Sequence, residues 1–139
     1  MAAVTEKDIA CAVSRITTAR GPTTVVRVRG EIDLVTIGSV RDALDTAVLD
    51  RPAYLVIDLV GVTFCGAHGF ALVITAVARA AGAGFELAVC GAPRRARRFW
   101  PVLWDAAHQP VCHADLAAAV RAPNSAGEAA VEHRVAESA

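Results

Sequence analysis

An apolar run that ends in a glycine-containing stretch and then opens a helix constrains this fold more than any other feature. Residues Ala53 to Val60 are nearly continuous in apolar side chains, which is typical of a central parallel strand covered on both faces. Residues 67–81 then have the length and apolar content of a helix. A strand that turns into a helix in this way places backbone N–H groups and the positive helix end at the surface. We therefore expect the recognition site in the intervening stretch, Val60 to Gly69.

Strand and helix signals alternate along the rest of the chain. In Thr23 to Ile32, apolar residues alternate with arginines, which predicts a strand with one buried face. Thr36 to Asp50 carries an apolar stripe at helical spacing and ends before Pro52. Further strands are predicted at Ala10–Ile16, Phe85–Cys90 and Val111–Cys112, and further helices from Pro93 and at Ala114–Val120.

This order predicts an α/β fold with a mixed, mostly parallel sheet of about four to five strands and about four helices. The first two strands form an antiparallel pair around the Gly21–Pro22 turn. We expect one domain over residues 10–121, preceded by an N-terminal segment (1–9) and followed by a polar, acidic tail (122–139) that is predicted to be disordered.

Composition excludes several classes of function. The 139 residues carry 14 basic and 14 acidic side chains, and this zero net charge argues against a nucleic-acid binder. The longest apolar stretch, Phe70 to Ala78, is too short to span a bilayer, and the polar N-terminus is not a signal peptide. We therefore expect a cytoplasmic protein without direct membrane insertion. Its four cysteines form no C-x-x-C pair, and neither a metal nor another cofactor is expected.

Several short motifs together resemble the STAS domain family. They are Gly30-Glu31-Ile32-Asp33 after the second strand, Val62-Thr63-Phe64 before a loop in which Gly69 opens a helix, and the Gly82–Gly84 break. The resemblance covers residues 10–121 and is to anti-sigma factor antagonists. It implies a STAS-like fold and a non-catalytic regulatory module. Such a module binds an ATP-binding anti-sigma factor of the kinase type and thereby releases a sigma factor.

The family's loop typically reads F-x-D-S-[ST]-G, and the anti-sigma kinase phosphorylates the serine after the aspartate. Here Phe64 and Gly69 match the pattern, whereas Gly66 stands at the aspartate and Ala67 at the phosphorylated serine. His68 occupies the position of the next serine or threonine. Ala67 has no nucleophilic oxygen, so the usual phospho-switch cannot operate there. The resemblance thus implies an antagonist fixed in its binding form, or a diverged domain with another partner.

Cysteines offer a different form of control. Cys65 precedes a helix, and helix N-termini lower the pKa of thiols. A redox switch in which Cys65 pairs with Cys90 or Cys112 is one hypothesis, and three small buried apolar residues are the other. His68 is likewise either a phosphoryl acceptor or metal ligand, or a loop histidine bonded to backbone.

Glu31 and Asp33 resemble a carboxylate pair, but no nucleophile or metal cluster accompanies them in the sequence. We expect Asp33 to cap the first helix and both residues to join the partner surface with residues 65–69. No enzyme activity is expected. The alternative function is a STAS subunit that docks on the ATPase of an ABC-type lipid or anion transporter.

Overall fold

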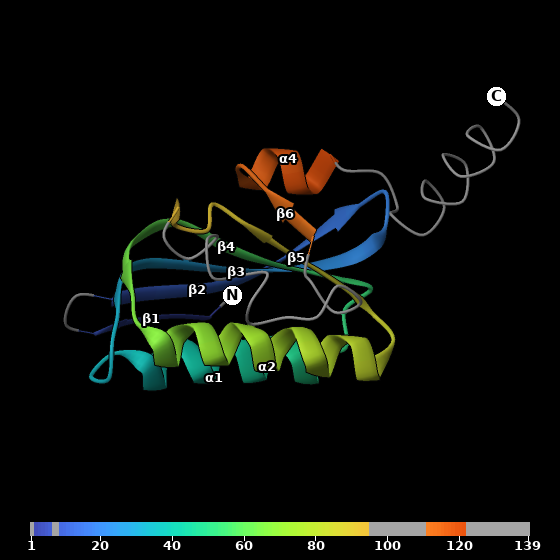
Figure 1. Ribbon diagram of the computed structural model, residues 1–139. Helices are drawn as coiled ribbons and strands as arrows, with labels where there is room; N and C mark the ends of the chain where they lie inside the picture. The colour runs from blue at the N-terminus through green and yellow to red at the C-terminus, as the bar shows by residue number, and fades with distance from the viewer. Residues whose placement is uncertain (1, 7–8, 95–110, 122–139) are drawn as a thin grey trace, which may run out of the picture.

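A six-stranded sheet in the order β1-β2-β3-β4-β5-β6 organises the molecule (Figure 1). The computed structural model describes residues 2–6, 9–94 and 111–121. The first two neighbouring pairs, β1–β2 and β2–β3, are antiparallel, and the remaining three are parallel. The strands are β1 (Ala2–Glu6), β2 (Ile9–Thr18), β3 (Gly21–Ile32), β4 (Tyr54–Cys65), β5 (Glu86–Cys90) and β6 (Val111–His113).

Helices cover both faces of this sheet unequally. Figure 1 shows α1 (Ile37–Leu49) and α2 (Ala67–Ala83) side by side under one face and the short α4 (Leu116–Arg121) over the other. Both long helices follow a strand directly and run back along the sheet, as crossover connections between parallel strands require. Among the described residues, no helix is long and apolar enough to cross a membrane.

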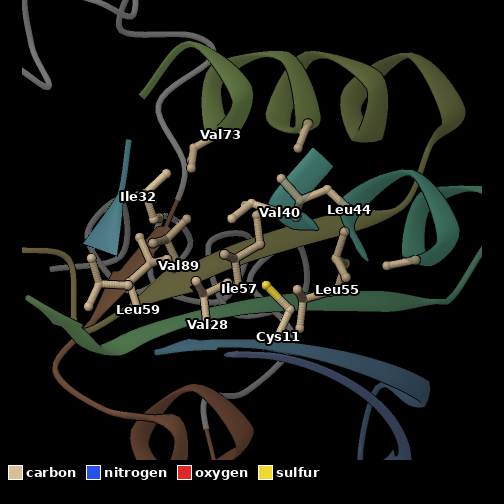
Figure 2. Packing of buried hydrophobic residues seen from close by; sticks show 14 of the residues in the cluster. Cys11, Val28, Ile32, Val40, Leu44, Leu55, Ile57, Leu59, Val73 and Val89 are labelled. Carbon is tan, nitrogen blue, oxygen red and sulfur yellow. The ribbon is translucent and has the colours of Figure 1, made fainter. Parts of the chain in front are cut away.

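The main core lies between the sheet and the two long helices (Figure 2). Along β3, Val26, Val28 and Ile32 are fully buried, while the intervening arginines lie on the opposite face. This alternation is the period of two that the sequence predicted. The packed side chains come from β2, β3, β4, β5, α1 and α2, and they include Cys11, Leu55, Ile57, Leu59, Val40, Leu44, Val73 and Val89.

A smaller core fastens α4 to the other face. It contains Tyr54, whose hydroxyl donates a hydrogen bond of 3.0 Å to the carbonyl of Ala119. The guanidinium of Arg20 lies 4.1 Å above the Tyr54 ring and pairs with Glu86 at 2.9 Å. These contacts tie α4 to the starts of β4 and β5.

The predicted fold class is confirmed, with three differences in detail. Gly21 and Pro22, expected as the turn, are paired in β3 with Thr18 and Thr17 of β2. Ala2–Glu6, expected only as an N-terminal segment, forms β1 and pairs with β2. β4 continues to Cys65, five residues beyond the predicted end at Val60. The helix expected from Pro93 falls mainly on residues 95–110, outside the described residues, as does the predicted tail at 122–139.

The extension of β4 leaves the sheet uneven at its carboxyl end. The last β4–β5 pair is Asp58 with Cys90, whereas β4 stays paired with β3 as far as Cys65 with Ile32. Two bulges interrupt the β3–β4 register along this stretch. Beyond Asp58, β4 is therefore paired with β3 alone among the described strands, while β2 accompanies β3 as far as Gly30. The candidate site lies at the tip of the β3–β4 pair.

Candidate functional site

The two loops expected to form the partner surface meet at the carboxyl ends of β3 and β4. Ile32 and Cys65 are paired in register, and the Gly66 N–H donates a hydrogen bond of 3.0 Å to the carbonyl of Ile32. This bond joins the loop after β3 to the loop before α2. The structure thus brings Glu31, Asp33 and residues 65–69 to one end of the sheet, where the sequence placed them.

Asp33 organises the turn that leads into α1. Its Oδ1 accepts hydrogen bonds from the N–H groups of Val35 (2.9 Å) and Thr36 (3.0 Å). In return, the Asp33 N–H donates to the Thr36 hydroxyl at 3.0 Å, and that hydroxyl also contacts the Glu31 carbonyl at 2.6 Å. The carboxylate therefore fixes the turn before α1. The N-cap of α1 itself is Thr36, without a side-chain cap, so the expected cap by Asp33 is replaced by this turn. Glu31 is exposed beside this turn.

The start of α2 has no charge of its own. Gly66 occupies the N-cap position in an extended conformation, without a side-chain cap, and the first turn contains no acidic residue. Ala67 and His68 are exposed there. Gly69 is buried in this first turn. A Cβ at this position would lie 2.7 Å from both Cys65 Sγ and Ile32 Cγ2. The glycine that matches the family pattern is therefore required for close packing of α2 on the strands.

Exposed apolar side chains surround these loops, and sequence reasoning missed them as site residues. Leu34 and Val35 are 71% and 76% exposed, and Phe64, paired across the strands with Glu31, is 54% exposed. Large apolar residues at this exposure favour contact with another molecule. The sequence did contain one indication of this surface: the apolar pair Leu34-Val35 stands between the end of a strand and the start of a helix, where polar residues are usual. We refer to Leu34, Val35, Phe64, Ala67 and His68 as the tip surface.

Cys65 lies partly buried at the end of β4, which favours the apolar-packing hypothesis over the reactive thiol. Burial raises its pKa to about 11, because a thiolate in apolar surroundings loses its hydration. Its thiol donates a long hydrogen bond of 3.8 Å to the Gly66 carbonyl and packs beside Gly69.

The cysteine pairs expected from the sequence do not form. Cys90 on β5 lies opposite Asp58 on β4. Between the pairs Arg27–Asp58 and Ile32–Cys65, β3 advances by five residues, so Cys65 lies roughly 16 Å farther along the sheet than Cys90. A disulfide needs Cα atoms within about 7 Å. Cys112 pairs with Val89 and so lies on the sheet face opposite Cys90. Burial, followed by the nearby Asp58 carboxylate, raises the pKa of Cys90 to about 12.

No cluster of three or more histidine, cysteine or acidic residues suited to a metal ion occurs within the described residues. His68 is exposed in the first turn of α2. The geometry of the tip is that of a binding surface: an apolar rim, a helix end with free backbone donors and a fixed turn.

A family model described as "Mlab, STAS domain" matches residues 17–103, more than half of the chain. The chain belongs to the STAS domain family. This STAS domain resembles the crystal structure of an anti-sigma factor antagonist from Mycobacterium paratuberculosis, at 29% identity and a TM-score of 0.63. That match covers 82% of this chain and 95% of the other. We found no match among curated proteins.

Two structures of SpoIIAA share the fold at 16% identity. The unphosphorylated anti-sigma factor antagonist has a TM-score of 0.56 over 88% of this chain and 98% of its own. The phosphorylated form, a Bacillus cell fate determinant, has a TM-score of 0.59 over 79% and 98%. The SpoIIAA structures show the fold, whereas the family and the likeness to the mycobacterial antagonist support a regulatory binding role for the STAS domain described here.

Proposed function

We propose that this STAS domain is a non-catalytic, cytoplasmic antagonist that binds an ATP-binding anti-sigma factor of the kinase type and so releases a sigma factor. The observation that carries the proposal is the tip surface, which combines exposed apolar side chains with an uncharged helix end. The likeness to the mycobacterial anti-sigma factor antagonist supports the same class of partner. Leu34, Val35 and Phe64 would supply the buried apolar contacts of the complex, which usually dominate binding energy.

Ala67 gives the proposed complex its particular behaviour. A phosphoserine at this place would add roughly −1.5 to −2 charges to the interface. Ala67 has no hydroxyl to modify, so the interface stays uncharged at this point. The proposed complex is therefore constitutive, and ATP does not dissolve it.

Calorimetric titration of purified anti-sigma kinases from the source organism tests the binding proposal. Val35→Asp places a charge in the tip surface and should weaken binding at least about tenfold. Leu49→Asp is the matched control, because Leu49 is equally exposed (75%) at the far end of α1. Equal affinities for both variants would move the interface away from the tip, and no binding by any such kinase would refute the proposal.

Labelled ATP tests the absence of the switch. With a bound kinase, the wild-type chain should take up no phosphate, whereas Ala67→Ser should become labelled and its complex should then dissociate. Failure of Ala67→Ser to be labelled within a stable complex would contradict the proposed orientation of the loop at the kinase. Capture of a transporter ATPase instead of a kinase would support the alternative function.

A further inference from the structure

A groove on the face that carries α4 is unrelated to the tip surface. It has a volume of about 520 Å³ and lies between the end of β3, the bulged part of β4 and the start of α4. This volume is within the range of about 300–1,000 Å³ that small-molecule sites occupy. We call it the Arg29 groove; it is lined by Arg27, Arg29, Asp58, Val60, Gly61, Asp115, Leu116 and Ala117.

A buried carboxylate fixes the first arginine of this groove. Asp58 is 5% exposed; its Oδ2 accepts a hydrogen bond of 3.2 Å from Arg27 Nε, and its Oδ1 accepts one of 3.0 Å from the Val60 N–H. Cys90 lies opposite Asp58 on the neighbouring strand β5. Each carboxylate oxygen of Asp58 thus accepts a hydrogen bond, and the bond from Arg27 is made by Nε. The terminal guanidinium nitrogens of Arg27 make no other hydrogen bond within the described residues.

A bulge and a glycine position the second arginine. The register passes from Arg27–Asp58 to Arg29–Gly61, so that β4 contains one extra residue here. Gly61 leaves room for the Arg29 stem, since a Cβ on Gly61 would lie 2.6 Å from Arg29 Cγ. Arg29 is exposed and forms no ion pair among the described residues. Bulges beside functional sites commonly re-aim a side chain in this way.

One oxygen of the acidic residue on the opposite wall, Asp115, already accepts a hydrogen bond. Asp115 Oδ1 accepts a hydrogen bond of 2.8 Å from the Ala118 N–H at the start of α4. The donors left uncommitted in the groove are the terminal N–H groups of Arg27 and the guanidinium of Arg29, and Val60, Leu116 and Ala117 supply an apolar wall. Two arginines on one strand face, two residues apart, can grip separate oxygens of one oxyanion.

We propose that the Arg29 groove binds a small phosphomonoester, with the phosphate held by Arg27 and Arg29 and the organic group against Val60, Leu116 and Ala117. A phosphate has enough oxygens to accept from both guanidinium groups, whereas one arginine satisfies a carboxylate. The groove is also larger than inorganic phosphate requires. The ligand would bridge β3, β4 and α4 and so tighten the attachment of α4 to the sheet.

Titration of the ¹⁵N-labelled chain with phenyl phosphate, followed by amide chemical shifts, tests this proposal. Saturable shifts are expected at Val60, Gly61, Leu116 and Ala117. Inorganic phosphate should bind the same amides more weakly, because it lacks the apolar group, and phenol should not shift them. Absence of saturable shifts at these amides with phenyl phosphate would overturn the proposal.

Arg29→Gln distinguishes specific binding in the Arg29 groove from non-specific attraction of anions to the surface. This variant keeps the stem over Gly61 and removes the charge, so the fold is retained and phenyl phosphate should bind at least about tenfold more weakly. Arg41→Gln is the matched control, since Arg41 is exposed on α1 and makes no ion pair within the described residues. Equal weakening by both variants would show non-specific attraction and would also overturn the proposal.

Discussion

Arg27 and Asp58 form an ion pair across the parallel strands β3 and β4 in which the carboxylate is buried and the guanidinium is partly exposed. The side chain of Asp58 is 7% exposed and that of Arg27 is 42% exposed. Asp58 therefore depends on its donors, since an unpaired buried carboxylate is costly. Removing it in turn leaves the Val60 N–H without its acceptor.

Asp58→Ala should accordingly lower the free energy of unfolding by about 2–4 kcal/mol, as measured by urea titration. Asp45→Ala is the comparison, because the Asp45–Arg79 pair is exposed on both sides and should be worth at most about 1 kcal/mol. If the two variants lost the same stability, burial of Asp58 would not be what makes its contacts important.

Gly69 and Gly82 both lie in α2 and should respond oppositely to alanine. Gly69→Ala forces a Cβ against Cys65 and Ile32, so we expect a loss of about 1–3 kcal/mol. Gly82→Ala meets nothing within 4 Å and should stabilise the helix by roughly 0.5–1 kcal/mol. Thermal unfolding of both variants measures this; a neutral Gly69→Ala would contradict the close contact of α2 with β3.

Gly66→Asp restores the family's carboxylate and should stabilise the chain. Gly66 already has the extended N-cap conformation. A Cβ added at this position would lie 3.6 Å from its nearest neighbour, a Phe64 ring carbon, which is an ordinary contact distance. The new carboxylate can accept from the free N–H groups of the first turn and interacts favourably with the helix dipole. We expect a gain of a few tenths to about 1 kcal/mol in urea unfolding. A loss would mean that Gly66 is required for the loop conformation.

Cys65 should react slowly with iodoacetamide. At about pH 8, its raised pKa of about 11 leaves few thiolates, and the rate should be at least about tenfold below that of the same cysteine in the urea-unfolded chain. The rate should also increase about tenfold per pH unit up to about pH 11, as peptide mass spectrometry can follow. A rate that is flat above about pH 9 would indicate an ordinary thiol limited only by access.

His113 should make the fold sensitive to mild acid. Burial, and then the nearby Arg20 charge, lower its pKa, so the folded state favours the neutral ring. The unfolded chain binds the proton from about pH 6.5 downward, so this contribution to stability is present above that pH and is lost as the pH falls. His113→Gln should therefore lose less stability than wild type between about pH 7.5 and about pH 5.5. Equal losses in urea titrations would show that other groups carry the acid response.

Local patterns predicted most of the fold. Val26 and Val28 alternate with arginines, and the apolar run from Tyr54 to Leu59 has no polar residue except Asp58; both patterns predicted their strands. β1 was missed because five residues carry too short a pattern, and its strand conformation depends on pairing with β2. The extension of β4 to Cys65 was missed because Gly61 and Thr63 resemble a loop, whereas pairing with β3 keeps them extended.

The site was predicted less completely than the fold. The motif around Glu31 and the glycine at position 69 indicated where the tip lies, because both belong to the local backbone geometry of the two loops. The sequence could not reveal that burial raises the pKa of Cys65, because burial depends on packing by distant residues. Nor could it reveal that Arg29 and Asp58 border one groove, because that depends on strand register.

The uneven end of the sheet affects how this domain can change over evolutionary time. The tip extends beyond the last pair of β4 with β5, away from most of the buried side chains that hold the two long helices to the sheet. Residues 66–68 contribute no side chain to the main core, so exchanging them leaves the packing of the core unchanged. Only the neighbouring Gly69 is tied to the packing. A descendant can thus acquire a new specificity at the tip while inheriting an unaltered scaffold.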